Sequence, residues 1–143
     1  MHRSAPMSLS FLVLALLSAT TGCETAPRPE LAWKPVAITD PSQVAGKWEG
    51  ILRREPPTKA ANDLVTILIL HDGRFRFLSV RTIGVLSGEG TFTVVDSGLS
   101  FTSDRGSIDM TLFEADNERM LKAKARSHDG FEYASDLTQV NAR

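Results

Sequence analysis

The chain is 143 residues long with a single cysteine, which is the size of one domain. This excludes a multidomain enzyme, an intrachain disulfide and a zinc site made of cysteines alone. Hydrophobic residues make up 42% and charged residues 23%, close to the globular average, so wholesale disorder is excluded. The formal net charge of -1 lacks the basic excess of a nucleic-acid-binding protein, so we expect no nucleic-acid partner.

The N-terminal segment, residues 1–22, has the pattern of an export signal. Arg3 supplies a positive charge, residues 7–17 form an apolar run, and small residues follow. A stable transmembrane helix needs roughly 20 apolar residues, so this run is short for a permanent span. We therefore predict a signal peptide over residues 1–22.

Gly22 and Cys23 stand directly after this apolar run and its small residues. Together they resemble the cleavage site of bacterial lipoproteins, in which a lipid is attached to the cysteine. The resemblance implies that a lipidated Cys23 anchors the chain to a membrane of the bacterial cell envelope. Glu24, in place of an aspartate, favours the outer membrane facing the periplasm. The alternative is an ordinary secretory signal with Cys23 as an incidental thiol.

The next segment, residues 23–44, contains four of the seven prolines, namely Pro27, Pro29, Pro35 and Pro41. Proline removes backbone donors and favours extended chain, so this composition predicts a tether between the lipid anchor and the folded domain. The folded domain is then expected over residues 45–143. Trp33 remains unassigned, either folded back onto the domain or close to the membrane surface.

From Gly46 onward the dominant hydrophobic period is two, which is typical of strands. Turn residues such as Asp72-Gly73 and Asp129-Gly130 separate the candidate strands. Eight short strands at spacings of about ten residues, with short links, predict an all-β fold: an antiparallel up-and-down eight-stranded barrel. The expected strands are 47–54, 64–70, 74–81, 87–96, 99–103, 107–113, 119–127 and 131–139.

The last hairpin allows a test of register. A two-residue loop would mix the polar and apolar faces of the strands 119–127 and 131–139, whereas a three-residue loop over 128–130 sorts them. Gly130 in a left-handed conformation would close such a loop. The predicted pairs are Arg126 with Glu132, Lys122 with Asp136, Ala125 with Tyr133 and Leu121 with Leu137.

Three short motifs resemble those of lipocalin-like (calycin) barrels: Gly46-Lys-Trp48-Glu-Gly50, Asp72-Gly-Arg-Phe75 and Gly88-Glu-Gly-Thr-Phe92-Thr-Val94. The resemblance implies that Trp48 anchors and plugs one end of the barrel, and that the barrel has the fold of small-ligand carriers. Lipocalins stack an arginine from a late strand on this tryptophan. Here the final predicted strand has no arginine, and Arg119 and Arg126 lie one strand earlier.

Residues suited to catalysis or metal binding are sparse. The tripeptide His-Asp-Gly occurs at residues 71–73 and 128–130, but these turns are expected at opposite ends of the barrel, where they cannot share a metal. No nucleophile stands in a G-x-S-x-G setting, and no phosphate loop is present. We therefore expect no catalytic residues, no metal and no cofactor.

A glycine-rich segment, residues 81–90, interrupts the alternation of the strands. If Phe92 points inward, so does Gly88, and a missing side chain there leaves interior room or permits close backbone approach. One interpretation is ordinary barrel closure. The other is a pocket mouth, for which the candidate residues are Ser79, Arg81, Leu86 and Gly88.

Two functions follow as hypotheses. The first is a non-enzymatic envelope lipoprotein whose barrel binds a small apolar or amphipathic ligand. The second is a protein-interaction module, such as a protease inhibitor or an envelope assembly partner, that uses a barrel end or rim. The first requires an open cavity in the barrel interior, and a core filled by phenylalanines would exclude it.

Overall fold

The computed structural model describes residues 31–57, 62–81 and 84–140. The predicted signal peptide and Cys23 lie outside these residues. In the described part of the chain, no helix is long and apolar enough to cross a membrane. The elements in chain order are β1 (Lys34–Val36), a 3-10 helix η1 (Pro41–Val44), β2 (Gly46–Glu55), β3 (Asn62–Ile69), β4 (Arg74–Arg81), β5 (Gly84–Thr91), β6 (Thr93–Val95), β7 (Gly98–Ser103), β8 (Gly106–Ala115), β9 (Glu118–Ser127) and β10 (Glu132–Val140).

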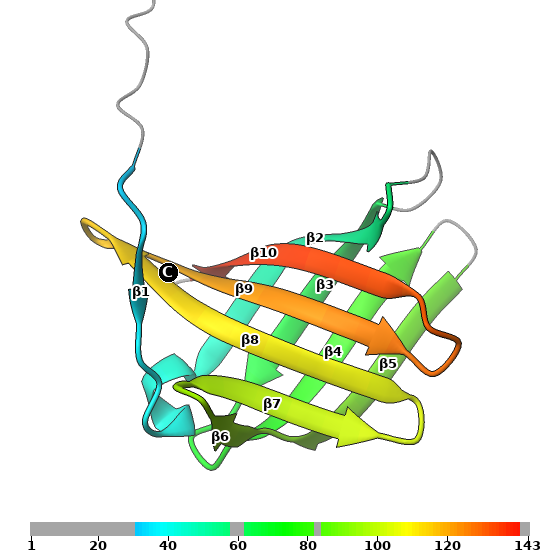
Figure 1. Ribbon diagram of the computed structural model, residues 1–143, viewed down its shortest axis with the longest axis horizontal. Helices are drawn as coiled ribbons and strands as arrows, with labels where there is room; N and C mark the ends of the chain where they lie inside the picture. Colours follow the sequence, from blue (N-terminus) through cyan, green and yellow to red (C-terminus); the bar gives the residue numbers. More distant parts are fainter. Residues whose placement is uncertain (1–30, 58–61, 82–83, 141–143) are drawn as a thin grey trace, which may run out of the picture.

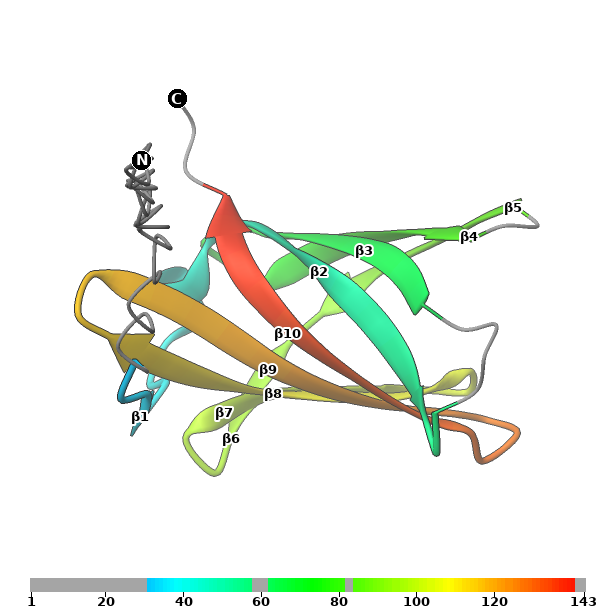
Figure 2. The same cartoon turned by 90° about the horizontal axis from the view of Figure 1, so that it is seen from above.

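The strands form one antiparallel sheet in the order β5-β4-β3-β2-β10-β9-β8-β7-β6, and β1 pairs with β8 outside this path. Figures 1 and 2 show this sheet curling around an interior, with β4 and β5 on one side and β7 and β8 on the other. The final strand β10 lies beside β2, which joins the two halves of the domain. The predicted all-β antiparallel barrel is confirmed, and the barrel is nearly closed.

The predicted strand number of eight is wrong, because the described residues form ten strands. One reason is that the expected strand 87–96 is two strands, divided at Phe92. There the Phe92 backbone N–H donates to the Gly73 carbonyl at 2.9 Å, and the chain changes partner from β4 to β7. Alternation continues across such a bend, so a period of two does not reveal it.

The other additional strand lies inside the predicted tether. β1 pairs with β8, and Ile38 and Val44 are 1% and 0% exposed within the core. Pro35 is tolerated because β8 is the one neighbour of β1 among the described strands, and proline is compatible with an edge strand. The described part of the segment predicted as a linker, residues 31–44, therefore packs on the barrel.

The last hairpin has the predicted register. Arg126 pairs with Glu132, Lys122 with Asp136, Ala125 with Tyr133 and Leu121 with Leu137. The Ser127 N–H donates to the Phe131 carbonyl at 2.9 Å, and Gly130 has a φ of 82°, so residues 128–130 form the loop. The three-residue loop is confirmed.

Candidate functional site

The barrel interior is filled at the end where β2 begins. Trp48 is fully buried there, and its indole Nε1–H donates to the Val44 carbonyl at 2.8 Å. Phe75 stacks on Phe92 with ring centroids 4.1 Å apart, and Phe101, which also lines the cavity described below, meets Phe75 edge-on at 5.0 Å. This end of the barrel is closed by aromatic side chains.

An arginine from β9 covers the tryptophan. The Arg119 guanidinium carbon lies 5.9 Å from the Trp48 ring centroid. Its Nη2 donates to the Gln43 carbonyl at 2.7 Å and its Nε donates to Glu114 Oε1 at 3.0 Å. The arginine next to Trp48 thus comes from the strand before the last, in agreement with its place in the sequence.

The other half of the interior contains a cavity of about 240 Å³ with a predominantly apolar lining. It exists because inward positions on several strands carry small side chains. On β9 the inward side chains shrink from Leu121 in the filled half to Ala123 and Ala125 in the cavity, and Ser79 on β4 and Ser135 on β10 are also small. Leu52, Val65, Ile67, Phe77, Ile108 and Leu137 supply most of the apolar wall.

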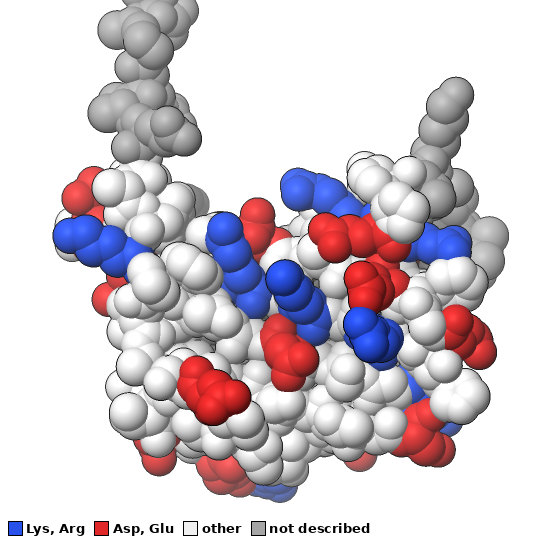
Figure 3. Space-filling view, viewed as in Figure 1, with Lys and Arg blue, Asp and Glu red and all other residues white. Residues whose placement is uncertain are grey.

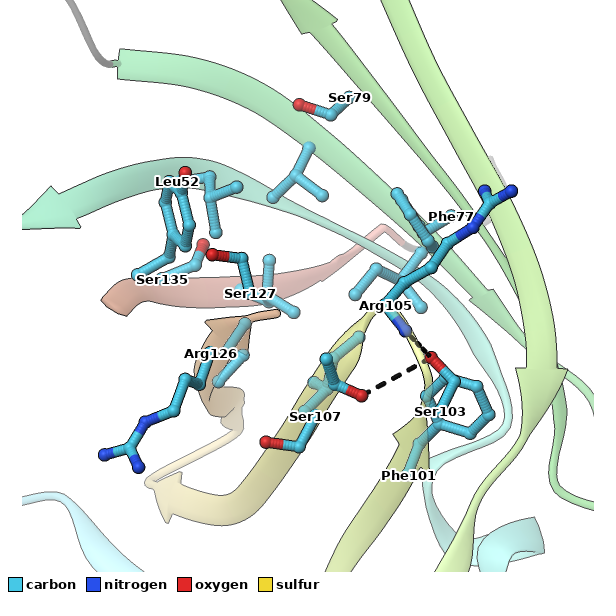
Figure 4. Close-up of a pocket in the computed structure, with 18 residues that line it drawn as sticks. Leu52, Phe77, Ser79, Phe101, Ser103, Arg105, Ser107, Arg126, Ser127 and Ser135 are labelled. Carbon is cyan, nitrogen blue, oxygen red and sulfur yellow. Dashed lines mark hydrogen bonds between the residues drawn. The ribbon is translucent and has the colours of Figure 1, made fainter. Parts of the chain in front are cut away.

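Two buried hydroxyl groups face this apolar space. Ser79 is 1% exposed and Ser135 is 4% exposed, and neither Oγ atom has a hydrogen-bond partner among the described residues. Figure 4 shows the two serines on different strands of the cavity wall. Leaving such a group unpaired costs about 1–3 kcal/mol, so these hydroxyls are a notable feature of an otherwise apolar wall.

The mouth of the cavity lies at the end of the barrel opposite Trp48. Gly106 pairs with Ser127 there, whereas Trp48 pairs with Gln139 near the other end of β10. Five polar residues of the lining lie on this side: Ser103, Arg105, Ser107, Arg126 and Ser127 (Figure 4). Among the residues that the structure describes, no aspartate or glutamate lines the cavity.

The two arginines at the mouth do not form a joint anion site. Their guanidinium groups extend in different directions in Figure 4. Arg126 Nη2 is paired with Glu132 Oε1 at 2.5 Å. Arg105 is held by its backbone N–H, which donates to Ser103 Oγ at 3.2 Å, while its side chain is exposed.

Of the four residues predicted from the sequence to form a pocket mouth, one lines the cavity. Ser79 lines the cavity, deep in the wall. Gly88 lies beneath the Phe77 ring, which occupies the space that a Cβ would take, and the rings of Phe101 and Phe75 cover Gly90 in the same way. The side chains of Arg81 and Leu86 fall outside the described part of the structure. The room predicted above these glycines is therefore filled by phenylalanine rings.

Sequence reasoning missed the actual opening at the β7–β8 turn and the end of β9. The pocket mouth was predicted at β5 because of its glycines, whereas the cavity results from small residues on β4, β9 and β10. The succession Leu121, Ala123, Ala125 is the local signal that could have indicated it. Which strands face one another across the barrel depends on long-range pairing, so this signal alone did not locate the opening.

The two His-Asp-Gly turns lie at opposite ends of the barrel, as predicted. Ile69, just before the first turn, pairs with Gly46 at the start of β2, and Glu132, just after the second, pairs with Glu55 at its end. Within residues 31–57, 62–81 and 84–140, no cluster of three or more His, Cys, Asp or Glu residues could hold a metal.

In the first of these turns, the Asp72 side chain is hydrogen-bonded within the turn. The Arg74 backbone N–H donates to Asp72 Oδ1 at 3.1 Å and the Arg74 Nε donates to Oδ2 at 2.7 Å. The backbone hydrogen bond and then the side-chain hydrogen bond hold the pKa of the Asp72 carboxyl below its ordinary value. Its hydrogen-bonding capacity is used within the turn, which gives this motif a structural role.

The outer face over β8, β9 and β10 carries mixed charge, as Figure 3 shows. The basic side chains of β9 face acidic residues on both neighbouring strands: Lys124 pairs with Asp109 of β8, and Lys122 pairs with Asp136 of β10. Opposite charges on adjacent strands cancel locally. This face therefore does not present a basic patch for an anionic partner.

Comparison of the chain with protein-family models, with curated proteins and with solved structures found no match.

Proposed function

We propose that this protein is a non-enzymatic lipoprotein of the bacterial cell envelope whose barrel binds a small apolar or amphipathic ligand. The cavity of about 240 Å³ inside the barrel is the observation that carries this proposal. An engineered apolar cavity of about 150 Å³ holds benzene, and drug-sized ligands use pockets of roughly 300–1,000 Å³. The cavity thus suits a ligand between these sizes.

The arrangement of the lining supports an amphipathic as well as a purely apolar ligand. An apolar body would lie against Val65, Ile67 and Leu137, and a polar end would meet the serines and Arg105 at the mouth. Burial of apolar surface provides about 25 cal/mol per Å², so even a small ligand gains useful affinity. The polar lining residues at the mouth lie at the end of the barrel opposite Trp48.

The lipocalin-like resemblance supports the same function. Trp48 is buried at one end of a nearly closed antiparallel barrel, and Arg119 lies over its ring. On this proposal the domain is a small lipocalin-like module. Lipidation of Cys23 by way of a cleaved signal peptide over residues 1–22 would hold it at a membrane, and we propose the outer membrane facing the periplasm.

Filling the cavity tests the proposal. Ala123→Leu adds a larger side chain to the cavity wall, so we expect binding of 2-methylnaphthalene to weaken at least about tenfold. The same change is expected to leave the free energy of unfolding unchanged or to raise it by about 0.5–2 kcal/mol, as cavity filling commonly does. Isothermal titration calorimetry and urea unfolding measure the two effects.

Ala134→Leu is the matched control, because Ala134 alternates with the inward residues of β10 and lies on the outer face. It should bind the probe as the wild type does. Equal binding by the wild type and by Ala123→Leu would contradict a ligand site in the cavity.

A second candidate function, a protein-interaction module, is favoured by one different observation. Five aliphatic side chains on the outer face of β2, β3 and β4 are each 38–48% exposed: Ile51, Leu64, Leu68, Leu78 and Val80. Ile51 pairs with Leu64 and Leu64 with Val80, so they form a contiguous patch. Contiguous exposed apolar patches of this kind mark protein–protein or membrane contacts.

The patch can be tested with Leu64→Glu/Leu78→Glu, which we expect to fold and to bind the naphthalene probe as the wild type does. An envelope protein that uses this patch should, once purified itself, bind the wild type at least tenfold more tightly than the variant by surface plasmon resonance. Thr111→Glu, at an exposed position on β8, is the control. If the purified partner binds both variants equally, this surface is not its docking site.

A further inference from the structure

The two unpartnered serine hydroxyls in the cavity carry information about the ligand. Ser79 on β4 and Ser135 on β10 are separated by β3 and β2 in the sheet. Each hydroxyl is more than nine-tenths buried, and neither finds a partner in the described residues. Alanine at either position would avoid the cost of an unpaired buried hydroxyl, so folding alone does not account for these side chains.

Water is a poor partner for these hydroxyls. A buried water typically makes about three hydrogen bonds, and it occupies sites with two to four polar partners. The register partners of both serines are apolar: Val65 pairs with Ser79, and Ala123 pairs with Ser135. A water at either serine would therefore lack most of its usual partners, whereas a ligand that also fills the apolar volume gains from both interactions.

The inference about the ligand rests on the proposed function. We propose that the ligand is an uncharged, mainly apolar molecule that carries at least one hydrogen-bonding oxygen, as in an alcohol, ketone or ester. This oxygen pairs with the hydroxyl of Ser79 or Ser135. The oxygen is uncharged because burying an unpaired charge in an apolar cavity is far more costly than burying a hydroxyl. The charged lining residues are Arg105 and Arg126, which sit at the mouth and point apart (Figure 4).

A pair of probes of nearly equal size tests this assignment. 2-Naphthol and 2-methylnaphthalene differ by a hydroxyl in place of a methyl group. Calorimetry measures the dissociation constant of each probe. We expect the constant for 2-naphthol, divided by that for 2-methylnaphthalene, to rise at least tenfold in Ser79→Ala/Ser135→Ala. The variant should keep the affinity of the wild type for 2-methylnaphthalene. Ser87→Ala, at an exposed position on β5, is the control and should leave the ratio unchanged.

Unfolding in urea separates ligand recognition from a structural role. Because neither hydroxyl has a partner among the described residues, the double variant should unfold at an equal or higher urea concentration than the wild type. A lower urea midpoint together with an equal loss of affinity for both probes would show that the serines support the fold. This result would overturn the inference.

The outcomes also distinguish this inference from the proposed function. If the double variant binds both probes in the same ratio as the wild type, the inference is wrong while the cavity remains a ligand site. If the wild type and Ala123→Leu bind neither probe, the proposed function itself is contradicted.

Discussion

Replacement of Trp48 by alanine is expected to lower the free energy of unfolding by about 3–5 kcal/mol, as truncation of large buried aromatics does. Trp48 is fully buried, its Nε1–H is bonded to the Val44 carbonyl, and Arg119 lies over its ring. A domain of this size has a total stability of about 5–15 kcal/mol, so the loss is a large fraction of the whole. Urea unfolding followed by circular dichroism measures it.

Two further variants provide a scale for the loss in the free energy of unfolding. Trp48→Phe keeps an aromatic ring but loses the Nε1 hydrogen bond, and should show a smaller loss. Trp33→Ala, at a half-buried position ahead of β1, should cost less than either. A loss for Trp48→Ala no larger than that for Trp33→Ala would show that Trp48 does not anchor this end of the barrel.

Substitution of Gly50 by alanine should destabilise the domain by about 3 kcal/mol, at the upper end of the usual cost of overpacking. Gly50 pairs with Leu137 where β2 meets β10. A Cβ there would collide with the Asp136 backbone carbonyl, and it would lie 3.0 Å from Leu137 Cδ2 and from Ser135 Oγ. A backbone atom cannot move aside as the end of a side chain can, so the two strands would have to separate.

Gly130→Ala is the comparison for this effect. Gly130 has a φ of 82°, but a Cβ there meets no atom within 4 Å. Its substitution should cost about 1–2 kcal/mol through the left-handed conformation alone, and should leave binding of the naphthalene probes intact. Thermal unfolding of the two variants under the same conditions gives the comparison. A Gly50→Ala protein as stable as the Gly130→Ala protein would contradict the close approach of β2 and β10.

The features that sequence predicted well are local ones. The last hairpin was predictable because Lys122, Lys124 and Arg126 alternate with apolar residues, and Lys122 and Arg126 face Asp136 and Glu132 across a short loop. One register alone sorts both faces and pairs the charges, so nothing outside the hairpin was needed. The role of Trp48 was an expectation from the resemblance of Gly46-Lys-Trp48-Glu-Gly50 to lipocalin-like barrels, and in the structure Trp48 is fully buried.

The features that sequence did not predict depend on contacts between distant segments. β1 contains Pro35, and its pairing with β8 joins residues about 78 positions apart, for example Pro35 with Phe113. The break at Phe92 reflects a change of neighbouring strand, which alternation does not record. The cavity likewise depends on which small residues from β4, β9 and β10 face one another once the barrel closes.

Native mass spectrometry of the protein purified from its own host, beside the Ala123→Leu variant prepared in the same way, tests the ligand site most directly. A ligand-binding barrel predicts that the wild type carries a small uncharged molecule that dissociates on collisional activation, and that the variant with the filled cavity does not. A wild type and a variant that both show the mass of the processed chain alone would contradict it.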